Sequence, residues 1–144
     1  MALLAPALFI PLSFGADSPD PAPGDRAAAA EKFLADKLAI WQKRLKLDDW
    51  RLSIRMVPSG ELKPKTLGNI HWDTPTKTAA IRVLRLAEYK LPEREALRDM
   101  EFTVVHELVH LQLASLPRSD ASRGAEEHAV NRLAEALLQL DRKQ

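Results

Sequence analysis

The stretch EFTVVHELVHLQLASL, residues 101–116, places two histidines and a glutamate in an otherwise apolar helical pattern. His106 and His110 are four residues apart, so on a helix both imidazoles project from one face and can bind the same metal ion. Glu107 lies one position further round, where a carboxylate can hold an attacking water and accept its proton. Without a metal, each unpaired polar group in such a buried helix would cost about 1–3 kcal/mol. The stretch therefore predicts a helix that binds Zn²⁺, rather than a buried helix whose histidines are satisfied by protein acceptors.

A zinc ion that keeps one position open for water needs a third protein ligand. The spacing HExxHxxGxxH does not supply it, because Leu113 and Leu116 occupy the glycine and third histidine positions. A second helical pattern, over residues 123–141, begins close behind. Its first turns contain three possible ligands, which are Glu126, Glu127 and His128.

Helical phase favours Glu127 as the third ligand. Val130 and Asn131 follow it by three and four residues, so Glu127 lies on the inward face beside a polar side chain. An amide at Asn131 can orient a ligating imidazole or carboxylate. Glu126 and His128 remain open as alternatives, since acidic residues are also favourable at a helix start for electrostatic reasons alone.

The rest of the chain predicts an α+β fold in which a small mixed sheet is backed by a helix. Apolar residues recur at helical spacing in one segment before the sheet, and they alternate with polar residues in the segments that we expect to be strands. Trp41, Trp50 and Trp72 are expected as packing residues. The expected elements are a helix over 27–47, strands over 50–57, 67–73 and 78–85, a helix from Pro92 that stops before Pro117, and a helix over 123–141.

Composition excludes several classes of protein. The chain has 144 residues, which suits one domain, and it has no cysteine, which excludes disulfides and cysteine-based zinc sites. A net charge of +1 gives no reason to expect nucleic acid as a partner. The proportion of hydrophobic residues, 46%, is typical of globular proteins.

Residues 1–25 begin with a short apolar run that is followed by a spacer rich in proline and aspartate. The run is too short and too interrupted by proline for a stable membrane span. It predicts a signal peptide or a flexible N-terminal segment, although no positive residue precedes Arg26. We therefore expect one domain over residues 26–144 in a secreted or periplasmic protein, with a cytoplasmic location left open.

The motif HELVH followed by EEHAVNRLAEALL resembles the HExxH zincins whose third ligand is glutamate, the gluzincins. It is similar in particular to the ImmA/IrrE-type minimal metallopeptidases, with Glu127 and Asn131 at matching positions. Val109 and Val130 replace the usual glycine and alanine, and the DNA-binding domain of that family is missing. The resemblance implies a minimal zincin-like fold, with a backing helix, a small mixed sheet, an HExxH helix and a C-terminal glutamate helix.

The resemblance also implies a zinc metallopeptidase that hydrolyses a peptide or protein substrate, with Glu107 as the general base. The strand over residues 78–85 would be the sheet edge that pairs with an extended substrate. Tyr89 and His71 are candidates for stabilising the oxyanion, and Arg123 is a weaker one. The alternative is a non-catalytic zincin-like module that binds a peptide or a partner and holds a structural metal. The sequence does not indicate an oligomeric state.

Overall fold

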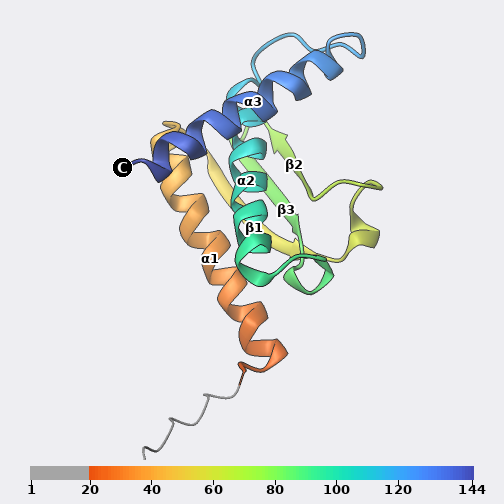
Figure 1. Ribbon diagram of the computed structural model, residues 1–144. Helices are drawn as coiled ribbons and strands as arrows, with labels where there is room; N and C mark the ends of the chain where they lie inside the picture. The colour runs from red at the N-terminus through yellow and green to blue at the C-terminus, as the bar shows by residue number, and fades with distance from the viewer. Residues whose placement is uncertain (1–19) are drawn as a thin grey trace, which may run out of the picture.

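The computed structural model describes residues 20–144, which form three long helices and one three-stranded sheet (Figure 1). The predicted α+β class and the order of the elements are confirmed. Residues 1–19 of the expected signal segment, which was placed at residues 1–25, lie outside the described residues. In chain order the elements are α1 (Pro23–Arg44), β1 (Arg51–Val57), the short 3₁₀ helix η1 (Ser59–Glu61), β2 (Gly68–Asp73), β3 (Thr78–Leu84), the 3₁₀ helix η2 (Leu86–Glu88), α2 (Glu93–Gln112) and α3 (Arg123–Arg142).

Helix α1 begins four residues earlier than the sequence pattern indicated. Pro23 lies in its first turn, where the missing backbone N–H costs no hydrogen bond, and Asp25 follows at the positive end of the helix. Pro23 and Asp25 are signals for a helix start that lie within residues 1–25, the segment that we expected to precede the domain. Within residues 20–144 no helix has both the length and the apolar character needed to cross a membrane.

The sheet has the strand order β1-β3-β2, with β1 parallel and β2 antiparallel to β3. Ile81 in the central strand faces Ile54 of β1 on one side and Ile70 of β2 on the other. The expectation that residues 78–85 form the edge strand is therefore wrong. Strand β3 is paired on both sides, and the free edge on the hairpin side belongs to β2.

One face of the sheet is covered by helices, with α2 at the centre of the core. Figure 1 shows α2 lying in front of the sheet, α1 beside it and α3 crossing one end of both. Side chains of β3 that point to the helices are buried, whereas Ala80 between them is exposed. The fully buried contacts between α2 and β3 involve Ile81, Val83, Met100, Val104, Val105 and Leu108.

Polar contacts fix α2 against α1 along the same interface. Glu101 on α2 accepts a hydrogen bond of 3.0 Å from the indole of Trp41 and pairs with Lys37 at 2.9 Å. Arg44 at the end of α1 pairs with Asp141 of α3 at 2.6 Å. The helix that carries the two histidines is thus held by packing and by ion pairs to its neighbours.

Gly68, at the start of β2, lets α2 approach the sheet closely. A Cβ atom at this position would collide with the methyl group of Thr103 on α2 and would lie 2.7 Å from the carbonyl oxygen of Arg82. Glycine is the one residue without this atom. The close approach brings β2 alongside the histidine-bearing face of α2.

Candidate metal centre

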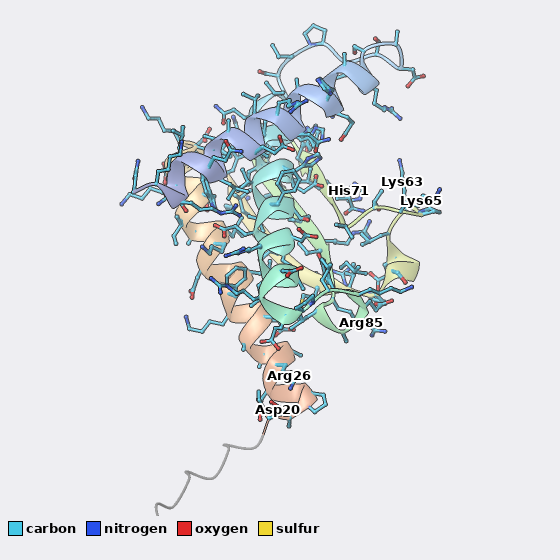
Figure 2. The ribbon with its side chains drawn as sticks, viewed as in Figure 1. Asp20, Arg26, Lys63, Lys65, His71 and Arg85 are labelled. Carbon is cyan, nitrogen blue, oxygen red and sulfur yellow. The ribbon has the colours of Figure 1, made fainter. Side chains whose placement is uncertain are left out.

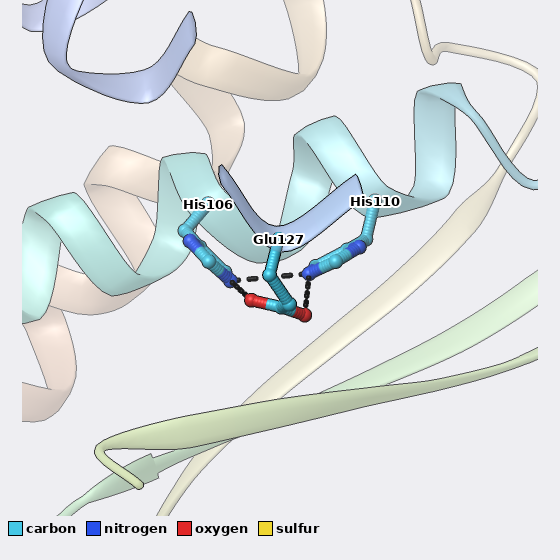
Figure 3. A group of neighbouring side chains, drawn as sticks. All are labelled: His106, His110 and Glu127. Atoms are coloured by element: carbon cyan, nitrogen blue, oxygen red, sulfur yellow. Dashed lines mark hydrogen bonds and ion pairs between the residues drawn. The ribbon is translucent and has the colours of Figure 1, made fainter. Parts of the chain in front are cut away.

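His106, His110 and Glu127 come together where α3 crosses α2, as shown in Figure 3. The two Nε2 atoms are 3.1 Å apart. One oxygen of Glu127 lies 2.9 Å from Nε2 of His110, and the other lies 3.3 Å from Nε2 of His106. One nitrogen or oxygen atom from each of the three side chains lies within 4.8 Å of the others, and the two histidines share one face of α2 as expected. Glu127 was expected on the inward face of α3, but its side chain is 49% exposed, whereas that of Glu126 is 16% exposed.

The donor set fits a zinc ion. Ligands bound tetrahedrally at about 2.0–2.1 Å from zinc lie about 3.3 Å from one another, which is close to the separations observed here. Two imidazoles and a carboxylate are also donors that zinc commonly takes. The three side chains of this group, which we call the His–His–Glu cluster, are therefore spaced as metal ligands.

The outer nitrogen of His110 is held by a second carboxylate. Nδ1 of His110 lies 3.0 Å from Oε1 of Glu126, so in the tautomer that donates this bond the Nε2 lone pair faces the cluster. That lone pair would then lie against a carboxylate oxygen of Glu127, and a cation or proton between the two is needed to offset their repulsion. Glu126 thus contacts His110 from outside the cluster, and the group within metal-binding distance contains Glu127 rather than Glu126.

Arg118, in the loop between α2 and α3, holds Glu126 in place. Its Nε and terminal nitrogens donate to the two carboxylate oxygens of Glu126 at 3.1 and 2.6 Å. The bond from Arg118 lowers the pKa of Glu126, and the bond from His110 acts in the same direction against the effect of burial. The guanidinium also lies over the ring of Trp72, 5.0 Å from its centroid. A chain of contacts therefore runs from Trp72 in β2 through Arg118 and Glu126 to His110.

The outer nitrogen of His106 has a different environment. Its Nδ1 is buried and has no hydrogen-bond partner among the described residues. Burial lowers the pKa of His106 and the charge of His110 lowers it further, whereas Glu127 and the side chain of Asn131 act in the opposite direction. Asn131 lines the same cleft, and its expected role in orienting a ligating imidazole stays a prediction, whereas Nδ1 of His110 lies 3.0 Å from Glu126.

Glu107 lies beside the cluster in a poorly hydrated position, with 7% of its surface exposed. Burial raises the pKa of Glu107 to about 8, and the negative charge of Glu127 adds to this effect. A carboxyl group with a raised pKa binds a proton more readily near neutral pH. Its position and its environment both suit a group that accepts and returns a proton.

The cluster opens into a cleft with a volume of about 870 Å³. Helix α2 forms one wall, β2 and the loop before it form the opposite wall, and the start of α3 closes a third side. Trp72 is half-buried and lines this cleft, so it is not only a packing residue, whereas Trp41 and Trp50 are buried as expected. Glu127 is 49% exposed and borders the opening.

Three of the proposed site residues lie elsewhere. His71 is exposed and contacts Arg82 at 3.1 Å, and it is not among the residues that line the cleft. Tyr89 does not line the cleft either, and its hydroxyl is buried without a partner among the described residues. His128 is exposed on α3 and takes no part in the cluster. Of the oxyanion candidates, the structure brings only Arg123 to the cleft, where it pairs with Asp120 at 3.2 Å.

Nothing in the sequence indicated a role for Arg118 or the contact between Glu126 and His110. Arg118 lies in an exposed loop with no periodic pattern, so no local signal connected it to the site. Glu126 was weighed as a ligand or as a solvated acid at a helix start. Its proximity to His110 depends on how α3 crosses α2, which a single sequence does not reveal.

Comparison of the chain with protein-family models, with curated proteins and with solved structures gives no match. The geometry of the cluster and the cleft therefore has to carry the functional argument.

Proposed function

We propose that this protein is a zinc-dependent metallopeptidase of minimal zincin-like architecture. The observation that supports the proposal most strongly is the convergence of His106, His110 and Glu127, with Glu107 beside them, in a cleft that is open to solvent. Among the described residues the cluster offers three ligands, and a site with three protein ligands leaves room for water. A closed structural site would require a fourth protein ligand.

Zinc, when bound, would lower the pKa of water towards neutrality and polarise the carbonyl of the bond to be cleaved. His106, His110 and Glu127 would hold the ion. Glu107 would accept a proton from the attacking water and return it to the amine as the peptide bond breaks. Glu126 would keep the Nε2 lone pair of His110 directed at the ion.

The substrate would lie along β2 rather than along β3. Strand β2 pairs with β3 on one side only, and Gly68, Ile70 and Trp72 line the cleft. A peptide in extended conformation could add to this edge through main-chain hydrogen bonds. The sheet edge is thus still proposed to pair with an extended substrate, but the edge strand is β2 and not the strand over residues 78–85.

The test is metal analysis of the purified protein, combined with cleavage of a peptide library. We expect zinc in both the wild type and Glu107→Gln, and hydrolysis by the wild type alone. Glu95→Gln is a matched control, because Glu95 is an exposed glutamate on the same helix but outside the cleft. Hydrolysis by Glu107→Gln would refute the mechanism. Bound zinc without hydrolysis by the wild type would favour the non-catalytic, partner-binding alternative.

A further inference from the structure

Resting on the proposed function, we infer that the loop end of the cleft binds a carboxylate of the peptide substrate through Lys63 and Lys65. Both lysines line the cleft from the segment between η1 and β2. Figure 2 labels them on this loop, which leads directly into the free edge strand. The protein would thus prefer substrates that carry a negative charge at a defined distance from the bond that is cut.

The loop that carries the two lysines is anchored at both ends. Leu62 is buried with Val57 and Leu84 in a small apolar cluster of its own. At the other end, the backbone N–H of Leu84 donates to the carbonyl of Leu67 at 2.9 Å. The ammonium groups therefore project from a backbone of fixed position.

A tight turn inside the loop holds Lys63 and Lys65 relative to each other. The backbone N–H and the hydroxyl of Thr66 both donate to the carbonyl of Lys63, at 3.1 and 2.7 Å. Pro64 restricts the backbone at the second position of this turn, and Lys65 takes a φ of 63° at the third. The turn therefore limits how far the two ammonium groups can separate.

The charge of the two lysines is not neutralised by any acidic side chain within residues 20–144. Among the residues that the structure describes, neither forms an ion pair, and the nearest acid in the sequence, Glu61, pairs with Arg55. By contrast, the arginines that line the other end of the cleft are neutralised, since Arg118 pairs with Glu126 and Arg123 with Asp120. The two ends of the cleft therefore differ in charge, because the positive charges are unpaired at the lysine end and paired with carboxylates at the arginine end.

The acidic residues of the cleft all lie away from the loop end. Glu127 belongs to the His–His–Glu cluster, Glu107 and Glu126 lie beside it, and Asp120 belongs to the loop before α3. Between the lysines and the cluster the cleft wall is mixed, with the apolar Leu67, Ile70 and Phe102 beside the polar Thr66, Asn69 and Thr103. A segment with some apolar side chains that ends in an acidic residue would fit this order of surfaces.

The spacing of a matching substrate can be estimated from β2. Trp72 lies at the cluster end of the strand, where it contacts Arg118, and both lysines precede the first residue of the strand, Gly68. An extended chain advances about 3.3 Å per residue, so the four steps from Gly68 to Trp72 correspond to roughly 13 Å. A peptide laid along β2 would therefore place an acidic residue at least about four residues from the scissile bond.

The experiment uses peptides that are blocked at both ends and share one cleaved sequence. A single glutamate is moved one position at a time along this sequence, and each peptide has a glutamine counterpart. The zinc-loaded wild type should cleave the best glutamate peptide with a kcat/KM roughly two- to fivefold higher than its counterpart, and the ratio should fall as salt rises. A further pair, without glutamate but with a free or amidated C-terminus, distinguishes a side-chain carboxylate from a terminal one.

Recognition without turnover is tested by measuring the binding of fluorescently labelled versions of the same peptides to zinc-loaded Glu107→Gln by fluorescence anisotropy. The double variant Lys63→Glu and Lys65→Glu should reverse the preference in both assays, so that a lysine peptide is favoured. Lys46→Glu is the matched control, because Lys46 is exposed, has a φ of 55° and lies outside the cleft.

The outcomes separate the inference from the proposed function. Cleavage without a charge preference, or with a preference that survives charge reversal, would overturn the inference and leave the peptidase proposal intact. Binding that depends on Lys63 and Lys65, without cleavage by the wild type, would support the inference and refute the hydrolytic function. Absence of both binding and cleavage would overturn both.

Discussion

Replacing Arg118 with glutamine should weaken zinc binding, although Arg118 is not one of the ligands. Its guanidinium holds Glu126 through two hydrogen bonds, and Glu126 in turn holds Nδ1 of His110 at 3.0 Å. Loss of the guanidinium leaves Glu126 free to adopt other rotamers. His110 would then lose part of the contact that directs its Nε2 towards the metal.

The size of the effect follows from the exposure of the two partners. The side chain of Arg118 is 40% exposed and that of Glu126 is 16% exposed, so solvent screens the pair in part. Two-point geometry places its contribution at the upper end of the range for exposed pairs, about 1 kcal/mol. Only the part of this free energy that differs between the zinc-bound and zinc-free forms enters the zinc Kd, so the Kd should rise by at most roughly fivefold. Glu126→Gln removes the carboxylate itself and should raise the Kd by about 10- to 100-fold.

Zinc affinity can be measured by competition with a chromophoric chelator, with circular dichroism to establish that each variant is folded. If Arg118 acts through Glu126, the variant that combines Arg118→Gln with Glu126→Gln should bind zinc as weakly as Glu126→Gln alone. Arg132→Gln on α3 is the control, since Arg132 pairs with Glu135 at 3.7 Å and is 71% exposed. An unchanged Kd for Arg118→Gln, or effects of the two substitutions that simply add, would contradict this reasoning.

Two further predictions concern the framework around the site. Gly68→Ala should lower the free energy of unfolding by about 1–3 kcal/mol in urea denaturation, because its Cβ collides with α2. Gly60→Ala is the control, since a Cβ there meets no atom within 4 Å, and it should change the free energy of unfolding little. Equal effects of the two substitutions would argue against the close approach. Burial raises the pKa of Tyr89, the single tyrosine, to about 12, and the charge of Asp99 adds to this effect. The neutral phenol should therefore stabilise the fold fully below the unfolded pKa of about 10, and this contribution should be lost as the pH rises towards 12. Ultraviolet absorbance should show phenolate formation near pH 12 in the folded protein and near pH 10 in urea, and a folded midpoint near 10 would refute the burial of this hydroxyl.

The ligand cluster could be predicted because its parts are set by local periodicity. His110 follows His106 by four positions, and a helix of any origin brings two such side chains to one face. Glu127 could be chosen over Glu126 and His128 because Asn131 follows it by one turn. Burial alone does not separate the two glutamates, since the buried residues Val130, Ala134 and Leu138 continue the phase of Glu126, which is 16% exposed against 49% for Glu127. The distances that make the three side chains a possible metal site then depend on one helix crossing, and the apolar faces of both helices favour that crossing.

The sheet order could not be predicted in the same way, because the pairing of β1 with β3 joins strands that are not consecutive. The hairpin between β2 and β3 is local, and its turn was visible in the sequence. Composition did contain a signal for the edge, since β2 reads GNIHWD and β3 reads TAAIRVL. Glycine, asparagine, histidine and aspartate suit an edge strand, and the more apolar strand suits the centre.

The ligands of the His–His–Glu cluster differ in how freely evolution could replace them. The side chain of His110 is 7% exposed on a helix whose other faces form the core, so its loss would leave a void beside that core. Glu127 is 49% exposed at the rim of the cleft, where another side chain can be accommodated without repacking. A single substitution on α3 could therefore abolish the proposed metal binding and leave the cleft and its edge strand intact. The architecture in this way keeps a short mutational path open between a metal-dependent protein and a metal-free binding scaffold.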